Sequence, residues 1–315
     1  MRLPSRFRLN ARPILVTGAN RSGTTWVGRV IASANNVRYV HEPFNHQHLD
    51  PERHLITPPF AHHYHYVEQG EARHVKRYLQ YRMGQRHPWL TDVSEQPGFR
   101  RIAGATRRWI DSIAHTRCRP LVKDPIALMS AEWLAHTFGM QVVVTIRHPA
   151  AYVSSILRLN WPMRPHVFIS QPALMKGFLA PLAEQITAQH RRENDPVGDA
   201  ILAWNVFHHV IALFQKRHPD WLFLRHEDLS RDYLTRFQEM FTWLDLSFGP
   251  HQKRLLETLC GSSNPAEAHG RVHQLKRDSQ ANIWNWKKRL GTAEIRRIRE
   301  ESADVAPLFY SVADW

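Results

Sequence analysis

Residues 14–31 read ILVTGANRSGTTWVGRVI, and the interpretation of the whole chain starts from this stretch. Its apolar, β-branched opening, Ile14–Val16, predicts a strand. Gly18 and Gly23 then bracket a loop, after which apolar residues return at helical spacing from Trp26 onward. The sequence therefore predicts a strand, a tight loop and the start of a helix.

The loop matches the phosphate-binding pattern G-x-x-x-x-G-K-[ST] at Gly18, Gly23 and Thr25, with Thr24 in the place of the lysine. Glycines let backbone amides curl around an anion, and the following helix adds the positive end of its dipole. The lysine of the pattern reaches the terminal phosphates of a nucleoside triphosphate, so its absence argues against ordinary ATP or GTP hydrolysis. Arg21, inside the loop, offers a cation instead.

The segment RSGTTW resembles the 5′-phosphosulfate-binding loop of sulfotransferases that use 3′-phosphoadenosine 5′-phosphosulfate (PAPS) as donor. The resemblance implies that the loop binds PAPS and that 3′,5′-ADP is the product. The donor contacts that it implies are Arg21, Ser22, Gly23, Thr24, Thr25 and Trp26.

A second, independent match lies downstream. The β-branched run Gln141–Ile146 predicts a buried parallel strand that ends at Arg147, and Pro149 suits the first turn of the next helix. Sulfotransferases bind the 3′-phosphate of PAPS with an arginine at such a strand end and a serine eight positions later. Arg147 and Ser155 have that spacing. Arginine offers a fork of donors to phosphate oxygens, and a serine hydroxyl adds a neutral donor.

The acceptor side is marked by a predicted strand, Val37–Val40, that runs into His41-Glu42-Pro43. A hydroxyl that attacks sulfur must lose its proton, so a base is needed there. In several carbohydrate and bacterial sulfotransferases a Glu-Pro pair in this place carries the base. The resemblance implies that Glu42 is the catalytic base, with His41 as the alternate base; a simple ion pair between Glu42 and an arginine is the other interpretation.

Another catalytic candidate, Lys123, ends the predicted strand Arg119–Lys123. Similar segments of sulfotransferases place a lysine here, facing the transferred group; a surface lysine past a strand is the alternative. Aryl and steroid sulfotransferases continue with Thr-His, whose histidine is their base, whereas this chain has Asp124-Pro125. The resemblance is therefore closer to bacterial and carbohydrate sulfotransferases, and the base role shifts to Glu42.

The C-terminal region is basic and rich in tryptophan, as in sulfotransferases whose last segment closes over the nucleotide. The resemblance implies that Arg277, Ser279 and Lys287 contact the donor, although a solvated basic face would have the same composition. The segment Arg225–Leu229 resembles one that follows the last strand in this family, and we interpret it as structural support. Trp204, in an apolar helix pattern, is expected in the core.

These elements predict a P-loop-type, three-layer α/β fold with a central, mainly parallel sheet flanked by helices. We expect one domain over residues 1–315, with a nucleotide-binding core of about 12–45, 119–160 and 221–290. Residues of about 46–117 and 159–196 read as helical insertions on the acceptor side, with helical pieces near 67–83 and 102–114.

The formal net charge of +14 favours anionic partners. The basic residues are spread through the chain, so we expect a nucleotide donor and a carbohydrate or glycolipid acceptor, and no nucleic acid. Two cysteines imply no disulfide framework, and the spacing of the histidines favours no metal site. The oligomeric state is left open.

The N-terminus is basic and lacks an apolar signal core, and no stretch approaches the roughly 18 apolar residues of a membrane span. The expected location is the cytoplasm. We favour a solvated tail for the four arginines before Ile14, with a peripheral contact at the inner face of an anionic membrane as the alternative.

The predicted activity is transfer of a sulfuryl group from PAPS to a hydroxyl or amine acceptor. Three alternatives stay open: a P-loop kinase or NTPase, a basic nucleic-acid-binding protein, and a non-catalytic nucleotide-binding relative.

Overall fold

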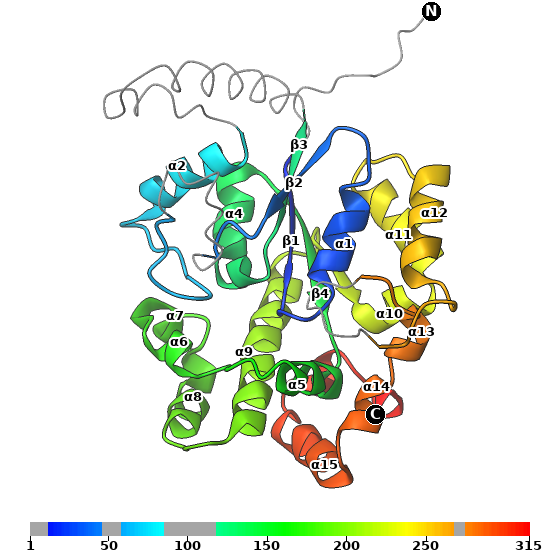
Figure 1. Ribbon diagram of the computed structural model, residues 1–315. Helices are drawn as coiled ribbons and strands as arrows, with labels where there is room; N and C mark the ends of the chain where they lie inside the picture. Colours follow the sequence, from blue (N-terminus) through cyan, green and yellow to red (C-terminus); the bar gives the residue numbers. More distant parts are fainter. Residues whose placement is uncertain (1–11, 46–57, 85–117, 268–274) are drawn as a thin grey trace, which may run out of the picture.

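The computed structural model describes residues 12–45, 58–84, 118–267 and 275–315, and a parallel five-stranded sheet lies at its centre (Figure 1). The strand order is β2-β3-β1-β4-β5, and every neighbouring pair is parallel. The strands are β1 (Ile14–Gly18), β2 (Val37–His41), β3 (Arg119–Lys123), β4 (Gln141–Ile146) and β5 (Leu222–Arg225). The predicted fold class is confirmed.

Helices connect the strands and cover the sheet. The α-helices are α1 (Thr24–Ile31), α2 (Ala72–Arg82), α4 (Ala131–Phe138), α5 (Pro149–Arg158), α6 (His166–Ile169), α7 (Pro172–Lys176), α8 (Ala183–His190), α9 (Pro196–Arg217), α10 (His226–Arg231), α11 (Tyr233–Trp243), α12 (Pro250–Cys260), α13 (Ser279–Asn282), α14 (Asn285–Arg289) and α15 (Thr292–Glu301). Short 3₁₀ helices are η2 (Ile126–Ser130), η3 (Ala180–Leu182), η4 (Ala306–Leu308) and η5 (Val312–Asp314).

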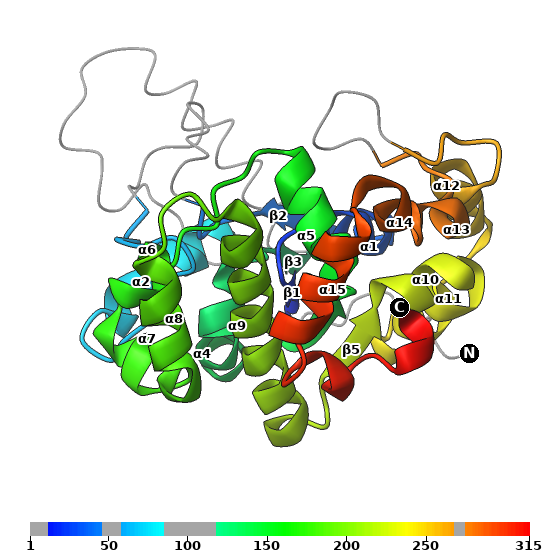
Figure 2. The same cartoon turned by 90° about the horizontal axis from the view of Figure 1, so that it is seen from below.

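The central strands β1, β3 and β4 are buried on both faces, as expected for parallel strands. Successive side chains of a strand point to opposite faces, so Leu15 and Val142 join one core cluster while Val16 and Val143 join the other. The first face is covered by α4, α5 and α9, and the second by α1, α11 and α12 (Figures 1 and 2). These are the three predicted layers.

Local signals in the sequence set the ends of two helices beside the sheet. Pro149 occupies the first turn of α5, where its missing N–H has no helical partner to lose. Gly139 ends α4 with φ 62°, a left-handed conformation that glycine adopts at low cost. The position of Pro149 agrees with the sequence analysis.

The described parts of the insertions are helical and pack onto the core. The predicted piece near 67–83 corresponds to α2, and residues 159–196 form α6, α7, η3 and α8; the piece near 102–114 lies outside the described residues. Two hydrogen bonds tie the first insertion down: the Tyr66 amide donates to Gln171 Oε1 (2.9 Å) and the Val67 amide to Ser130 Oγ (3.0 Å).

Helix α9 departs from the expectation that no segment is apolar enough to span a membrane. By length and composition alone, it passes as a membrane span, the one helix in the described ranges to do so. Within its most apolar window, however, 78% of the residues are buried inside the protein. Trp204, in this helix, is fully buried as predicted.

Gly18 is required by the close approach of β1 to β4. Its φ is 138°, and a Cβ there would collide with the main-chain oxygen of Thr145 and lie 2.7 Å from its hydroxyl. We expect Gly18→Ala to lower the free energy of unfolding by at least about 2 kcal/mol. Denaturant unfolding measures the loss.

Gly70→Ala is the matched control, because a Cβ at Gly70 meets nothing within 4 Å and the site has no positive φ. Its effect should stay within about 0.5 kcal/mol. Equal stabilities of the two variants would contradict the steric argument.

Candidate active site

The functional candidates gather at the carboxyl ends of the strands because all the strands are parallel. The loop after β1 begins at Gly18, and Arg147 follows β4. Lys123 at the end of β3 lies opposite Val16 of β1 and His41 of β2 in the pairing register. Open α/β sheets bind their ligands at this edge.

The loop between β1 and α1 is bent by residues in left-handed backbone conformations. Gly18, Arg21 and Gly23 have φ of 138°, 64° and 99°. Backbone amides turned outward by such conformations can form an anion-binding concavity. Gly23 directly precedes α1 and has no side chain with which to cap it, so the amides of the first helical turn suit an external anion.

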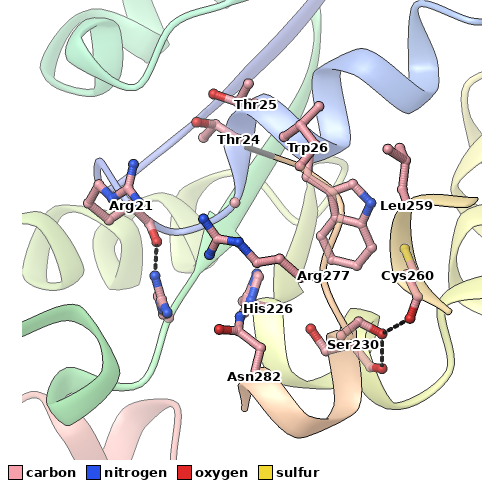
Figure 3. Close-up of a pocket in the computed structure, with 14 residues that line it drawn as sticks. Arg21, Thr24, Thr25, Trp26, His226, Ser230, Leu259, Cys260, Arg277 and Asn282 are labelled. Carbon is pink, nitrogen blue, oxygen red and sulfur yellow. Dashed lines mark hydrogen bonds between the residues drawn. The ribbon is translucent and has the colours of Figure 1, made fainter. Parts of the chain in front are cut away.

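A pocket with about 720 Å³ of empty space, partly open to solvent, lies against this loop (Figure 3). It is lined by Arg21, Gly23, Thr24, Thr25, Trp26, Arg147, His226, Ser230, Leu259, Cys260, Leu275, Arg277, Ser279 and Asn282.

Three arginines from distant parts of the chain meet in this pocket. Arg21 donates from Nε to Ser155 Oγ (3.1 Å), and Arg147 donates from Nη1 to the Arg21 carbonyl (2.5 Å). Arg277 extends between Trp26 and Arg21 in Figure 3. The Nε atoms of Arg147 and Arg277 are buried without a hydrogen-bond partner in the described parts of the chain.

The positive charges of these arginines repel one another. Burial, followed by the charges of Arg147, Arg277 and Arg158, lowers the pKa of Arg21 to about 9. Burial also lowers the pKa of Arg147 to about 10, with Glu227 opposing and Arg277 adding to the shift. An anion bound among the guanidinium groups would relieve this repulsion, so the pocket is electrostatically suited to phosphate groups.

The other wall of the pocket is aromatic and apolar, with Trp26, Leu259 and Leu275 on it. The ring of His226 packs edge-on against Trp26, with ring centroids 5.7 Å apart. Burial, followed by the charges of Arg147, Arg277 and Arg21, holds its pKa well below the usual value, so the imidazole is neutral. A Cβ on Gly23 would lie 2.7 Å from His226 Nδ1, which explains why glycine is needed where the loop meets this ring.

Glu42 and Lys123 form an ion pair beside the loop, between Oε1 and Nζ. Lys123 is fully buried, and its side chain packs under α1, because a Cβ on Gly28 would lie 2.9 Å from Lys123 Cγ. Glu42 has φ 38°, a strained conformation for a non-glycine residue of the kind found at functional sites. Burial would raise the pKa of Glu42, but Lys123 and Asn45 outweigh it, and the carboxylate is ionised at neutral pH.

Asp124, at the position where aryl sulfotransferases have threonine, holds neighbouring backbone segments in place. It is fully buried, and its two carboxylate oxygens accept from the amides of Phe44 (2.7 Å) and Ile126 (2.9 Å). Burial, with the charge of Glu42, raises its pKa to about 7. Its carboxylate binds the loop that carries Glu42, and solvent does not reach it.

The structure gathers most of the predicted donor residues in one pocket, with exceptions. Ser22 is buried, and its hydroxyl contacts Thr145 Oγ1 (2.6 Å). The Ser155 hydroxyl accepts a hydrogen bond from Arg21 Nε. Lys287 donates to the Trp315 carbonyl (3.0 Å) and lies over the rings of Trp284 and Trp286. These three residues are not among those lining the pocket, nor are His41, Glu42 and Lys123.

Six lining residues were not predicted. His226 belongs to the segment Arg225–Leu229, which the sequence suggested to be only structural support, although its place directly after β5 was a usable signal; Ser230 follows that segment. The others come from the end of α12 and the segment near Arg277, and neither spacing nor chemistry marks them beforehand. They are Leu259, Cys260, Leu275 and Asn282.

Across the described ranges, no group of three or more His, Cys, Asp or Glu side chains could hold a metal ion. In the histidine-rich segment that begins near His62, His65 pairs instead with Glu71, with 2.6 Å between Nε2 and Oε1.

Comparison with solved structures gives several sulfotransferases. The sulfotransferase domain of the olefin synthase of Synechococcus PCC 7002 has a TM-score of 0.51 and 16% identity, with coverage of 99% of this chain and 98% of that one. The sulfotransferase domain from the curacin biosynthetic pathway has a TM-score of 0.46 and 14% identity, with coverage of 96% and 99%. Sulfotransferase STF9 from Mycobacterium avium has a TM-score of 0.44 and 13% identity, with coverage of 95% and 76%.

At these identities the likeness concerns the fold. A comparison with curated protein sequences gives no significant match. The sequence model described as "Sulfotransferase family" matches residues 13–250, which include the loop after β1, the Glu42–Lys123 pair and Arg147. The chain belongs to the sulfotransferase family.

Proposed function

We propose that this sulfotransferase uses PAPS as its donor and transfers the sulfuryl group to a hydroxyl or amine of a carbohydrate or glycolipid. One observation supports the donor assignment. A single pocket is lined by three arginines, by the loop after β1 and by an aromatic side chain; the arginines are Arg21, Arg147 and Arg277. PAPS has two separate phosphate positions and a purine base, and the pocket offers a cationic side for the phosphates and Trp26 for the base.

Each part of the pocket has a distinct role in this proposal. The amides of the loop from Gly23 to Trp26 hold the 5′-phosphate, because the Ser22 amide already donates to the Ala19 carbonyl (3.2 Å), and the hydroxyls of Thr24 and Thr25 are further donors. Arg147 and Arg277 bind the 3′-phosphate. Arg21 connects the 5′-phosphate side of the pocket to the 3′-phosphate side, because its side chain contacts Ser155 while its carbonyl accepts from Arg147.

PAPS supplies the sulfuryl group and leaves as 3′,5′-ADP. Glu42 accepts the proton of the attacking hydroxyl, because it is an ionised carboxylate at the end of β2, beside the phosphate loop. Lys123 orients this carboxylate through their ion pair, and with Arg21 it offsets negative charge that develops on the transferred group and the leaving oxygen. Asp124 is excluded from the base role because it is fully buried and bound to backbone amides.

The acceptor class rests on the resemblance in sequence. The Glu42-Pro43 pair and the absence of Thr-His after Lys123 favour a carbohydrate or glycolipid hydroxyl over a phenol or steroid. A transfer assay with radiolabelled PAPS and an extract of glycans and lipids tests this directly. Label in a glycan or glycolipid product supports the proposal, whereas label only in small phenols would contradict the acceptor class.

Nucleotide binding to the pocket can be measured by thermal stabilisation. We expect 3′,5′-ADP to raise the melting temperature more than ATP with Mg²⁺, because the pocket has separate cations and the loop lacks the lysine that reaches a γ-phosphate. Arg277→Met should weaken 3′,5′-ADP binding by about tenfold or more, since it removes a charged donor from the pocket.

Arg236→Met is the matched control, because Arg236 is exposed on α11 and pairs with Glu239. Its affinity for 3′,5′-ADP should equal that of the wild type. Greater stabilisation by ATP with Mg²⁺ than by 3′,5′-ADP would favour the kinase or NTPase alternative.

The transfer step depends on Arg21. Arg21→Ala should lower transfer from PAPS by roughly 10²-fold or more, because it removes a cation beside the reacting group. Circular dichroism and the melting temperature should show a retained fold. Wild-type turnover by this variant would show that Arg21 is only a rim residue of the pocket.

The base is tested by comparing Glu42→Gln with His41→Ala. Glu42→Gln should lower kcat by roughly 10²- to 10⁴-fold with little change in 3′,5′-ADP affinity, because a neutral amide cannot accept the acceptor's proton. His41→Ala should keep most of the activity. The reverse order of effects would transfer the base role to His41, and unchanged activity in both variants would remove this pair of residues from the mechanism.

A further inference from the structure

The turn between β4 and α5 is held by two buried side chains that the proposed chemistry does not use. Trp204 Nε1 donates to the carbonyl of Arg147 (2.8 Å), and Glu227 Oε1 accepts from the amide of His148 (3.1 Å). That carbonyl and that amide belong to the same peptide group. Both of its hydrogen-bonding groups are therefore bound by side chains far away in the sequence.

The two side chains that bind this peptide group come from two different helices. Trp204 lies in α9, which packs along α5, and Glu227 lies in the first turn of α10, directly after β5 (Figure 2). Trp204 is fully buried and Glu227 is 4% exposed. Water therefore has little access to replace either hydrogen bond, and loss of one would leave a buried polar group of the turn without a partner.

A second layer holds Glu227 and the turn in place. The hydroxyl of Tyr310 donates to Glu227 Oε2 (2.9 Å), so each carboxylate oxygen has a donor. The ring of His148 stacks on Trp286 with centroids 5.1 Å apart and packs edge-on against Tyr310. The peptide group is thus held on both sides.

The side chain that leaves this turn is Arg147, whose guanidinium contacts the Arg21 carbonyl and lines the pocket. A rotation of the peptide plane would move the Cα–Cβ direction of Arg147 and hence its guanidinium. A charged fork recognises a phosphate only when its donors face the oxygens, so its orientation matters as much as its charge.

We propose that Trp204 and Glu227 are positioning residues that orient the Arg147–His148 peptide group so that Arg147 reaches the 3′-phosphate of the donor. This inference rests on the proposed function, because it takes Arg147 as a 3′-phosphate ligand. Neither residue touches the donor. Their effect is expected in discrimination between nucleotides with and without a 3′-phosphate.

The test uses the full chain and the ratio of the Kd for 5′-AMP to the Kd for 3′,5′-ADP, measured by calorimetry. The two ligands differ only in the 3′-phosphate, so the ratio isolates recognition of that group and does not depend on how much of a variant is folded. The wild type should strongly prefer 3′,5′-ADP, and Arg147→Met should lose most of this preference.

The informative pair is Glu227→Met and Glu227→Gln. Methionine cannot accept from the His148 amide, so we expect the ratio to fall by about tenfold or more. Glutamine keeps an acceptor of the same shape without the charge and should retain a ratio within about threefold of the wild type. Trp204→Phe removes the donor to the Arg147 carbonyl and should resemble Glu227→Met.

Phe214→Leu is the control for damage to the core, because Phe214 is a fully buried aromatic residue of α9 that is not in contact with the turn. It should lower the melting temperature but leave the ratio unchanged. Wild-type ratios in both Glu227→Met and Trp204→Phe would overturn the positioning role. An equal loss in Glu227→Gln and Glu227→Met would also overturn it, in favour of the charge of Glu227. If the wild type binds neither nucleotide, the proposed function fails, which is a different result.

Discussion

The hydrogen bond from Arg147 to the carbonyl of Arg21 joins the two loops on which the site depends. One loop follows β1 and the other follows β4, and these strands pair in parallel from Ile14 to Gly18. Parallel pairing brings the two strand ends to the same edge, and the close contact between Gly18 and Thr145 sets the two loops side by side. The loop after β1 and Arg147 are therefore held together as one structural unit.

The cost of this arrangement is electrostatic. Arg21, Arg147 and Arg277 are held close together in a largely buried pocket, where, besides burial, Arg147 and Arg277 lower the pKa of Arg21 and Arg277 lowers that of Arg147. A fold tolerates such repulsion when the binding of an anion offsets it, and nucleotide phosphates are suited to do so. Burial, together with the charges of these arginines, lowers the pKa of His226 and keeps it neutral, so the ring can form a wall of the pocket without adding to the positive charge.

The acceptor side follows a different principle. Glu42 and Lys123 neutralise each other in a nearly dry environment, at the ends of neighbouring strands. The strained backbone of Glu42 is held by the hydrogen bond from its amide to the Lys123 carbonyl (2.9 Å), and Asp124 fixes the next turn through Phe44. A single carboxylate is thereby held in one orientation by its neighbours, as the base role proposed for it requires.

The sequence by itself determined the class of fold and the core of the site. The strand runs, Gly18 and Gly23, Pro149 and the spacing of Arg147 to Ser155 are local signals, because each reflects the backbone geometry of a few neighbouring residues. They placed the strands β1 to β4 and, together with the resemblance to sulfotransferases, most of the residues that line the pocket. Contacts across the chain were decided by tertiary structure: the pairing of Glu42 with Lys123, the turning of Ser155 toward Arg21, and the pocket wall at His226, Leu259 and Cys260. Tertiary structure also decided the two hydrogen bonds that Trp204 and Glu227 make to the Arg147–His148 peptide group. These depend on which helix packs over which strand end, and no spacing within a single element encodes that.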